Sequence, residues 1–137
     1  MGRCMFCDII ARREKAYILY ENDDVCCFLD KYPINKGHVL VVPKKHYEEF
    51  SEVDSRSLAE VILLGQRIAR ILEKVLKPDG ITVLQNNGIF KDVPHYHMHI
   101  FPRYKEDGFS WNEPDLEVSG EYFELFQQKI MEHLSMD

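Results

Sequence analysis

The sequence predicts an α+β fold, in which a five-stranded antiparallel sheet is combined with one long central helix and a C-terminal helix. Three features indicate it: short β-prone runs between turn residues, a long run of apolar residues at steps of three and four, and a run in which polar and apolar residues alternate. A single core commonly serves about 100–150 residues. We therefore expect the 137 residues to form one domain, residues 1–137.

The first three expected strands lie in the N-terminal third of the chain. A short apolar-periodic stretch, residues 6–10, precedes them. Residues 17–20 and 25–29 are rich in β-prone side chains and flank the turn residues 22–24, so they predict a hairpin. Residues 37–43 predict a third strand, which ends in a proline because proline cannot donate a backbone hydrogen bond to a neighbouring strand.

A long helix is expected to follow the third strand. Ser51 and Asp54 are both residue types that cap helix N-termini. The apolar residues that then recur at three- and four-residue steps predict a buried face: Leu58, Val61, Ile62, Ile68, Ile71, Leu72, Val75 and Leu76. Pro78-Asp79-Gly80 ends this helix, and residues 81–85 predict the fourth strand.

The last two elements come after a loop that begins with Asn86-Asn87-Gly88. Residues 95–102 alternate between polar and apolar side chains and predict the fifth strand. Ser119 is a suitable cap for the final helix. The apolar residues of that helix are Tyr122, Phe123, Phe126, Ile130 and Leu134.

The composition argues against several classes of function. A net charge of −6 does not suit a protein that binds nucleic acid, because neutralising phosphates needs clustered Lys and Arg. No apolar run reaches the roughly 18 residues that cross a bilayer, so we expect no membrane partner. Cys4 and Cys7 form C-x-x-C, and Cys26 and Cys27 are adjacent, a poor layout for disulfides between distant loops. We expect a cytoplasmic protein.

The expected fifth strand carries three histidines at steps of two. Successive strand side chains point to opposite faces, so His95, His97 and His99 are expected to share one face of the sheet. One zinc ion is a poor explanation for all three, because strand residues rise about 3.3 Å each and the outer two attach about 13 Å apart. The plainest alternative is that they are ordinary hydrogen-bonded histidines without a chemical role.

A histidine row suits chemistry at phosphorus. An imidazole with a pKa of about 6.5 offers a ring nitrogen near neutral pH without help from a strong base. A neighbouring carbonyl or imidazole must hold the other nitrogen protonated, and further donors must neutralise the phosphate charge. Three histidines on one face can meet both needs.

These segments resemble the histidine-triad (HIT) family, whose motif is three histidines separated by single apolar residues. The resemblance covers about residues 4–103 and extends well beyond the triad. The similar segments, in the family's order, are Phe28-Leu29-Asp30, residues 37–46 (Gly37 to His46), Asn86-Asn87-Gly88 and residues 95–101 (His95 to Phe101).

The resemblance implies a covalent mechanism. His97 is the middle histidine, which in the family attacks the α-phosphate of a nucleotide and forms a nucleotidyl-histidine that water hydrolyses. His99 and His38 would contact or orient the phosphate and the nucleophile. Asn86 matches a phosphate-contacting position, and Asp30 would accept hydrogen bonds from ribose hydroxyls.

The resemblance also implies where the base binds and how copies assemble. Phe6, Ile9 and Phe28 match positions that line the base pocket in the nucleotide-binding branch, and they are equally explained as plain core residues. Family members are commonly homodimers that join two five-stranded sheets into one. We therefore expect a nucleotide or nucleotide-conjugate substrate, a homodimer and no organic cofactor.

Cys4-Met5-Phe6-Cys7 has the spacing of a zinc knuckle, but two thiolates complete only half of a tetrahedral shell. In similar bacterial members, a histidine after the third strand and the first triad histidine complete the shell, which implies His46 and His95 here. Such a zinc would be structural, because four protein ligands leave no position for substrate. Ordinary apolar cysteines and redox chemistry remain open as alternatives.

The sequence departs from the family pattern immediately before the triad. Residues 89–94 replace a longer loop that carries Gly-Gln-Ser/Thr-Val. Asp92 would repel phosphate at close range, whereas Lys91 could attract it. Two hypotheses follow: a hydrolase of nucleoside phosphoramidates, dinucleoside polyphosphates or similar conjugates, favoured over a transferase because the chain is short, and a zinc-stabilised nucleotide-binding or interaction protein with little turnover.

Overall fold

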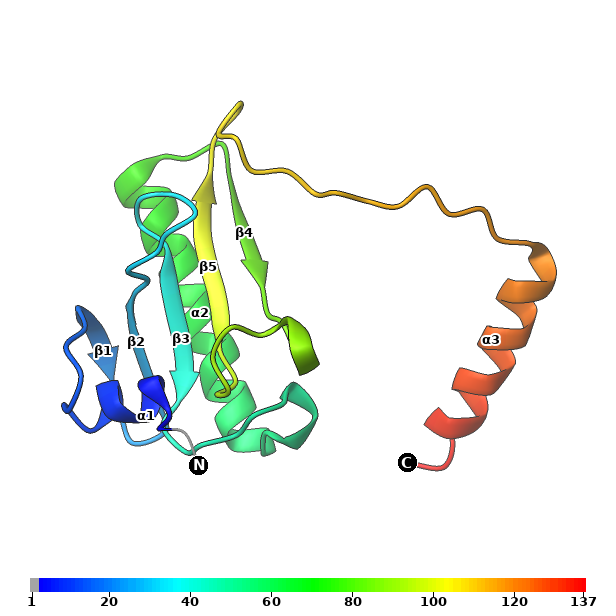
Figure 1. Ribbon diagram of the computed structural model, residues 1–137, viewed down its shortest axis with the longest axis horizontal. Helices are drawn as coiled ribbons and strands as arrows, with labels where there is room; N and C mark the ends of the chain where they lie inside the picture. The colour runs from blue at the N-terminus through cyan, green and yellow to red at the C-terminus, as the bar shows by residue number, and fades with distance from the viewer. Residues whose placement is uncertain (1–2) are drawn as a thin grey trace.

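The computed structural model describes residues 3–137 and contains a five-stranded antiparallel sheet in the order β1-β2-β3-β5-β4 (Figure 1). This confirms the predicted α+β fold. The elements are α1 (Met5–Ile10), β1 (Ile18–Glu21), β2 (Val25–Leu29), β3 (Val39–Pro43), α2 (Ser55–Leu76), β4 (Gly80–Leu84), β5 (Met98–Arg103) and α3 (Gly120–Leu134). Two short 3-10 turns, Phe50–Glu52 and Gly88–Phe90, lie in the connections.

The predicted hairpin of β1 and β2 is closed by one amide side chain. Asn22 Oδ1 accepts hydrogen bonds from the backbone N–H of Asp24 at 2.8 Å and of Val25 at 3.0 Å. Asparagine stabilises turns by accepting such hydrogen bonds from backbone N–H groups a few residues later in the chain. The chain then pairs β2 with β3 over five residue pairs, from Val25 opposite Pro43 to Leu29 opposite Val39.

Helix α2 begins at Asp54, whose Oδ1 accepts a hydrogen bond from Ser57 N at 2.7 Å. The other cap candidate, Ser51, lies inside the 3-10 turn Phe50–Glu52, so its prediction as a cap was wrong. The helix covers the sheet with Val61, Leu64, Ile68 and Leu72, all buried. The predicted face was too wide, because Ile62, Ile71 and Val75 are exposed on the outer side of the helix.

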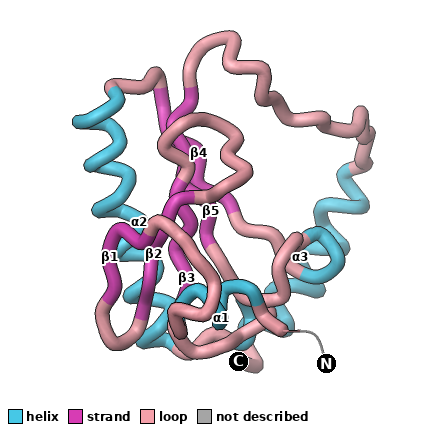
Figure 2. Tube along the Cα trace, turned by 60° about the vertical axis from the view of Figure 1, so that its left-hand side comes forward, coloured by secondary structure: helices cyan, strands magenta, loops and turns pink. Residues whose placement is uncertain are grey.

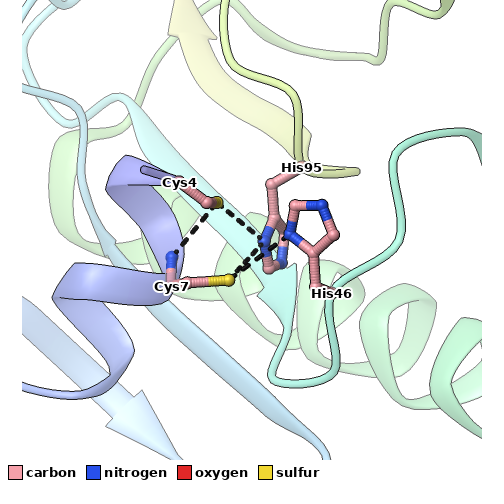
Figure 3. A group of neighbouring side chains, drawn as sticks. All are labelled: Cys4, Cys7, His46 and His95. Carbon is pink, nitrogen blue, oxygen red and sulfur yellow. Dashed lines mark hydrogen bonds between the residues drawn. The ribbon is translucent and has the colours of Figure 1, made fainter. Parts of the chain in front are cut away.

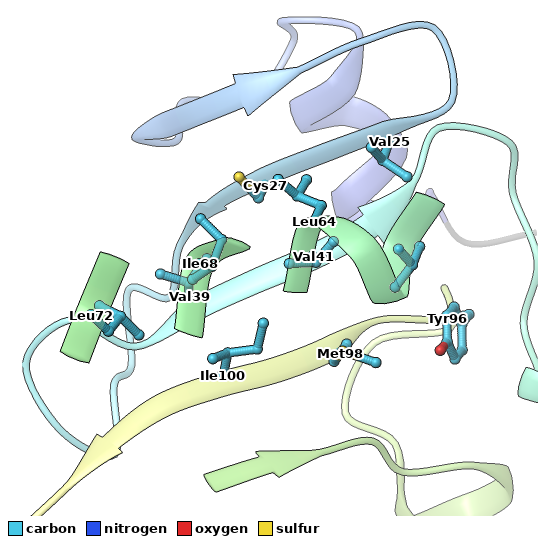
Figure 4. Close-up of a cluster of buried hydrophobic side chains, with 11 residues drawn as sticks. Val25, Cys27, Val39, Val41, Leu64, Ile68, Leu72, Tyr96, Met98 and Ile100 are labelled. Atoms are coloured by element: carbon cyan, nitrogen blue, oxygen red, sulfur yellow. The ribbon is translucent and has the colours of Figure 1, made fainter. Parts of the chain in front are cut away.

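A glycine lets α2 approach the sheet closely. A Cβ atom at Gly65 would lie 3.1 Å from Met98 Sδ and 3.2 Å from Ile100 Cδ1. Figure 4 shows the resulting core between α2 and the strands, with Tyr96, Met98 and Ile100 facing the helix. These are the alternate residues that the sequence predicted on the face opposite the histidines.

The fifth strand is shorter at its start than predicted. Regular pairing begins at Met98, and residues 95–97 precede it. The backbone N–H of Tyr96 instead donates to the carbonyl of Tyr47 at 2.6 Å, so this segment binds the connection that follows β3. Its side chains still alternate between the two faces of the sheet.

Helix α1 covers the second face of the sheet. Phe6 and Ile9 are buried there against Phe28, Leu40 and other side chains of β2 and β3. The sheet therefore lies between α2 on one side and α1 on the other (Figure 1). This arrangement brings the N-terminal cysteines beside the segment that carries the histidines.

The C-terminal part of the chain leaves the sheet as an extended arm. Residues 104–119 lead away from β5 to α3, which stands apart from the rest of the chain in Figure 1, and Figure 2 draws the arm as a long loop that ends in this helix. Ser119 Oγ accepts from Tyr122 N at 3.2 Å, which confirms the predicted cap. In residues 3–137, we find no helix long and apolar enough to cross a membrane.

Candidate active site and metal centre

His97 lies on the α1 side of the sheet with one ring nitrogen committed to the backbone. Its Nδ1 is 2.6 Å from the carbonyl oxygen of His95. A carbonyl only accepts hydrogen bonds, so Nδ1 must carry the proton. In the neutral ring, Nε2 then has a free electron pair. A histidine that attacks phosphorus needs such an arrangement.

His38 and His99 form a second, buried unit. The backbone N–H of Ile34 donates to His38 Nδ1 at 3.0 Å, which leaves the proton of His38 on Nε2. His38 Nε2 lies 3.0 Å from His99 Nδ1 and donates to it. His99 therefore carries its own proton on Nε2, where it can donate to a phosphate oxygen.

Burial keeps this unit neutral. Burial lowers the pKa of His99 to about 4, and it also lowers the pKa of His38. Asp30 opposes these shifts, since its Oδ2 lies 3.5 Å from His38 Nε2 and 4.0 Å from His99 Nδ1. The other oxygen of Asp30 accepts from the backbone N–H of Tyr32 at 2.9 Å. The carboxylate is thus fixed beside the histidines.

Asp92 lies directly beside the Nε2 atom of His97. Its Oδ1 lies 3.2 Å from His97 Nε2, although the side chain is 78% exposed. A carboxylate oxygen only accepts hydrogen bonds, so it gains no hydrogen bond from a ring nitrogen with a free electron pair. The carboxylate occupies space that an incoming phosphate needs.

Lys91, which the sequence suggested could attract phosphate, is paired with a carboxylate in this structure. Its ammonium pairs with Glu49, and it also donates to the carbonyl of Gly88 at 3.3 Å. Attraction of phosphate by Lys91 stays a prediction. Glu49 also accepts from Gly88 N at 2.9 Å, so the pair fixes the loop before the triad.

A cavity of about 580 Å³ opens beside the histidines. Asn86, Asp92 and His99 line one part of it, and Phe109 and Trp111 line another. The last two come from the C-terminal arm, residues 104–119, where the sequence had indicated no site residue. The isolated tryptophan among polar residues was the one signal that could have pointed to them.

The three residues proposed for the base pocket lie in the core cluster under α1. Phe6, Ile9 and Phe28 are at most 5% exposed, and none of them lines the cavity described above. The Phe6 ring meets the His97 ring edge-on at 4.9 Å and the Phe28 ring at 5.3 Å. Phe6 packs against the His97 ring, and a role of the three residues in base binding stays a prediction.

The four residues predicted as metal ligands converge at the end of α1 (Figure 3). Cys7 Sγ lies 3.3 Å from His46 Nδ1 and 3.5 Å from His95 Nδ1, and Cys4 Sγ lies 3.4 Å from His95 Nδ1. A zinc ion with bonds of about 2.3 Å to sulfur and 2.0 Å to nitrogen separates tetrahedral ligands by about 3.3–3.8 Å. The donor atoms therefore already have suitable spacing for zinc.

The surroundings also prepare these donors. His95 Nε2 donates to the carbonyl of Pro43 at 2.8 Å, which leaves Nδ1 free as a ligand atom. Burial lowers the pKa of His95 to about 4, so its ring is neutral near pH 7. Burial and the neighbouring Cys4 raise the pKa of Cys7 to about 11, so a bound cation would have to displace protons.

Comparison with known proteins agrees with this geometry. Residues 11–106 match the family model described as the HIT domain. An uncharacterized HIT-like protein of Saccharolobus solfataricus is 41% identical over 96% of this chain and 97% of its own length. The protein belongs to the HIT family.

Two solved structures of HIT proteins bear on the site. A histidine triad nucleotide-binding protein from Candida albicans is 27% identical and superimposes with a TM-score of 0.87, covering 98% of this chain and 99% of its own. A zinc-bound histidine triad family protein from Mycobacterium smegmatis is 30% identical with a TM-score of 0.73, covering 98% and 97%. Nucleotide binding and zinc binding therefore both occur among the solved relatives of this HIT protein.

Proposed function

We propose that this HIT protein is a nucleotidyl hydrolase that cleaves nucleoside phosphoramidates, dinucleoside polyphosphates or related conjugates at the α-phosphate. The observation that carries the proposal is the hydrogen bond from His97 Nδ1 to the carbonyl of His95, since it fixes the tautomer that exposes Nε2. The buried His38–His99 unit beside it offers an N–H for the phosphate.

In the first step, His97 Nε2 forms a bond to the α-phosphorus, and the bond from phosphorus to the leaving group breaks. The leaving group departs with the electron pair and takes a proton from solvent water. The ring gains positive charge, which the hydrogen bond from Nδ1 to His95 O stabilises, while His99 Nε2–H donates to a phosphate oxygen. In the second step, water attacks phosphorus, loses a proton to the solvent and breaks the P–N bond, whose electron pair returns to Nε2. This releases a nucleoside monophosphate and restores His97.

The remaining substrate contacts belong to the same proposal. Asp30 would accept hydrogen bonds from the ribose hydroxyls, and Asn86 would donate to the phosphate from the wall of the cavity. Phe6, Ile9 and Phe28 would contact the base, which requires α1 to shift when the nucleotide binds because these side chains are packed in the core under it. These assignments rest on the family resemblance together with the positions of the side chains.

We further propose that Cys4, Cys7, His46 and His95 bind a structural zinc ion. Supporting this are the spacing of the donor atoms and the hydrogen bond that frees His95 Nδ1. Four protein ligands would leave the metal no position for substrate, so it would supply no Lewis-acid chemistry. It would tie α1 to the segments that follow β3 and precede β5.

The test is turnover of adenosine 5′-phosphoramidate and of a dinucleoside polyphosphate by the wild type, His97→Ala and His133→Ala. His133 is an exposed histidine of α3 and serves as the matched control. We expect release of adenosine monophosphate by the wild type and His133→Ala, and a loss of at least a thousandfold with His97→Ala. Equal rates for His97→Ala and wild type would refute the mechanism.

The second candidate is a nucleotide-binding or interaction protein with little turnover. The position of Asp92, 3.2 Å from the nucleophile, favours it because the carboxylate competes with phosphate for that space. Binding of adenosine monophosphate by the wild type, without turnover of either substrate, would select this candidate.

A further inference from the structure

The carboxylate of Asp92 covers the nucleophile of the proposed reaction. Its Oδ1 lies 3.2 Å from His97 Nε2, the atom that would attack phosphorus. A bond from Nε2 to phosphorus needs the same space, so a nucleotide can react only after this carboxylate has moved. Within residues 3–137, the Asp92 carboxylate has no polar partner other than His97. Its position must therefore be set mainly by the backbone that carries it.

That backbone is held by Glu49, which lies on the connection between β3 and α2. One carboxylate oxygen of Glu49 accepts from Gly88 N at 2.9 Å, and the other pairs with the Lys91 ammonium. The Lys91 side chain is only 12% exposed, so salt and water screen this ion pair less than a fully exposed one. Glu49 thereby fixes both ends of the segment 88–91, which directly precedes Asp92.

Lys91 and Asp92 point to opposite sides of their segment. The backbone of Lys91 is extended, with φ −82° and ψ 141°, and successive side chains of an extended chain point in opposite directions. The carboxylate thus lies at the nucleophile while the ammonium lies at Glu49. A turn of this segment about its own axis would exchange the two side chains. Gly88, whose φ is +65°, gives the segment a conformationally permissive residue at its start.

We propose that Glu49 is a positioning residue, which holds Asp92 over the nucleophile until a substrate phosphate replaces Glu49 on Lys91. This inference rests on the proposed function, because it concerns the access of phosphate to the same histidine. The phosphate competes with the Glu49 carboxylate for the ammonium, and the segment turns when the carboxylate is displaced. The charge beside the nucleophile then changes from negative to positive, which suits a phosphate.

The first test is the affinity for adenosine monophosphate, measured by isothermal titration calorimetry. Glu49→Gln and Lys91→Met both lose the same ion pair, so a merely structural pair would change the affinity in the same direction in both. Glu49→Gln frees the ammonium and should tighten binding about threefold. Lys91→Met has no ammonium for the phosphate and should weaken binding about threefold. Glu52→Gln loses the same charge at an exposed position of the same connection and should bind like the wild type.

The second test measures access to the nucleophile without turnover. Diethyl pyrocarbonate is uncharged and reacts with an imidazole nitrogen that has a free electron pair, so peptide mass spectrometry can follow the modification of His97. Glu49→Gln and Lys91→Met should both raise its rate about threefold, since both release Asp92. In an Asp92→Ala background, Glu49→Gln should change nothing further. His133, an exposed histidine of α3, is the internal reference and should react equally in every variant.

Three results would overturn the proposal. Wild-type reactivity of His97 in Glu49→Gln would mean that the ion pair does not hold Asp92 in place. An equal increase in the Asp92→Ala background would mean that breaking the pair loosens the whole loop. A shift of the affinity in the same direction in Glu49→Gln and Lys91→Met would exclude the exchange on the lysine.

Failure of the proposed function is a separate result. A protein that binds adenosine monophosphate but hydrolyses neither substrate can still show the expected pattern of affinity and modification. Far-ultraviolet circular dichroism of each variant verifies the fold, and residues 49 and 91 both lie outside the α-helices and strands.

Discussion

The neutral state of His99 makes stability depend on pH in a predictable direction. Burial lowers the pKa of His99 from its ordinary value of 6.5 to about 4. Between these two values the unfolded chain binds a proton at this position and the folded chain does not. The free energy of unfolding must therefore fall as the pH falls from 6.5 toward 4, because protons favour the state that binds more of them.

The size of this effect follows from the same two values. One pKa unit corresponds to about 1.4 kcal/mol. At pH 5.0 the pH is about 1.5 units below the pKa of this histidine in the unfolded chain. About 2 kcal/mol of the free energy of unfolding present at pH 7.5 is therefore lost through His99. With a urea dependence of about 1–3 kcal/mol per molar, the midpoint of unfolding shifts by about 1 M.

The assay is urea unfolding of the wild type and His99→Gln at pH 7.5 and pH 5.0. We expect the loss of stability between these pH values to be about 2 kcal/mol smaller in His99→Gln than in the wild type. His133→Gln removes an exposed histidine and should keep the full pH dependence of the wild type. Equal pH dependence in the wild type and His99→Gln would show that His99 is not held neutral by burial.

Three further outcomes can be measured. Asp92→Asn should raise kcat/KM for a dinucleoside polyphosphate about fivefold, since a charge about 4 Å away in water costs about 1 kcal/mol; an unchanged rate would mean that Asp92 swings aside. Cys7→Ala should lower the zinc content from about one ion per chain to almost none, and it should lower Tm. A wild-type protein purified without metal would exclude the zinc site. Tyr96→Phe should have a free energy of unfolding equal to that of the wild type or up to about 1 kcal/mol higher. The reason is that the Tyr96 hydroxyl is buried without a hydrogen-bond partner among the described residues. A loss of stability above about 1 kcal/mol would contradict this.

The sequence was most informative where side-chain periodicity decides the structure. The alternation of residues 95–102 correctly placed His97 and His99 opposite Met98 and Ile100. Periodicity does not report where pairing begins, and the strand starts at Met98 because Tyr96 N bonds to the carbonyl of Tyr47 instead. That bond joins distant parts of the chain, so no local pattern contains it.

Charge placement was harder to predict than periodicity. The sequence identified Lys91 and Asp92 as departures from the family pattern and indicated that the lysine could attract phosphate, but it did not reveal the pairing of the lysine with a carboxylate. Its partner Glu49 is distant in sequence and becomes its neighbour only after folding. Trp111 reaches the cavity for a similar reason, because Phe109 packs edge-on against Phe101 and positions the arm at that wall. Such contacts depend on the tertiary fold.

One residue connects the two clusters of this molecule. The ring of His95 faces the cysteines, while its own carbonyl oxygen orients the ring of His97. A change in the position of the His95 imidazole is therefore transmitted through a single Cα to the carbonyl that orients the His97 ring. If the four residues bind zinc as proposed, loss of the metal would disturb the orientation of His97 before it disturbs the sheet.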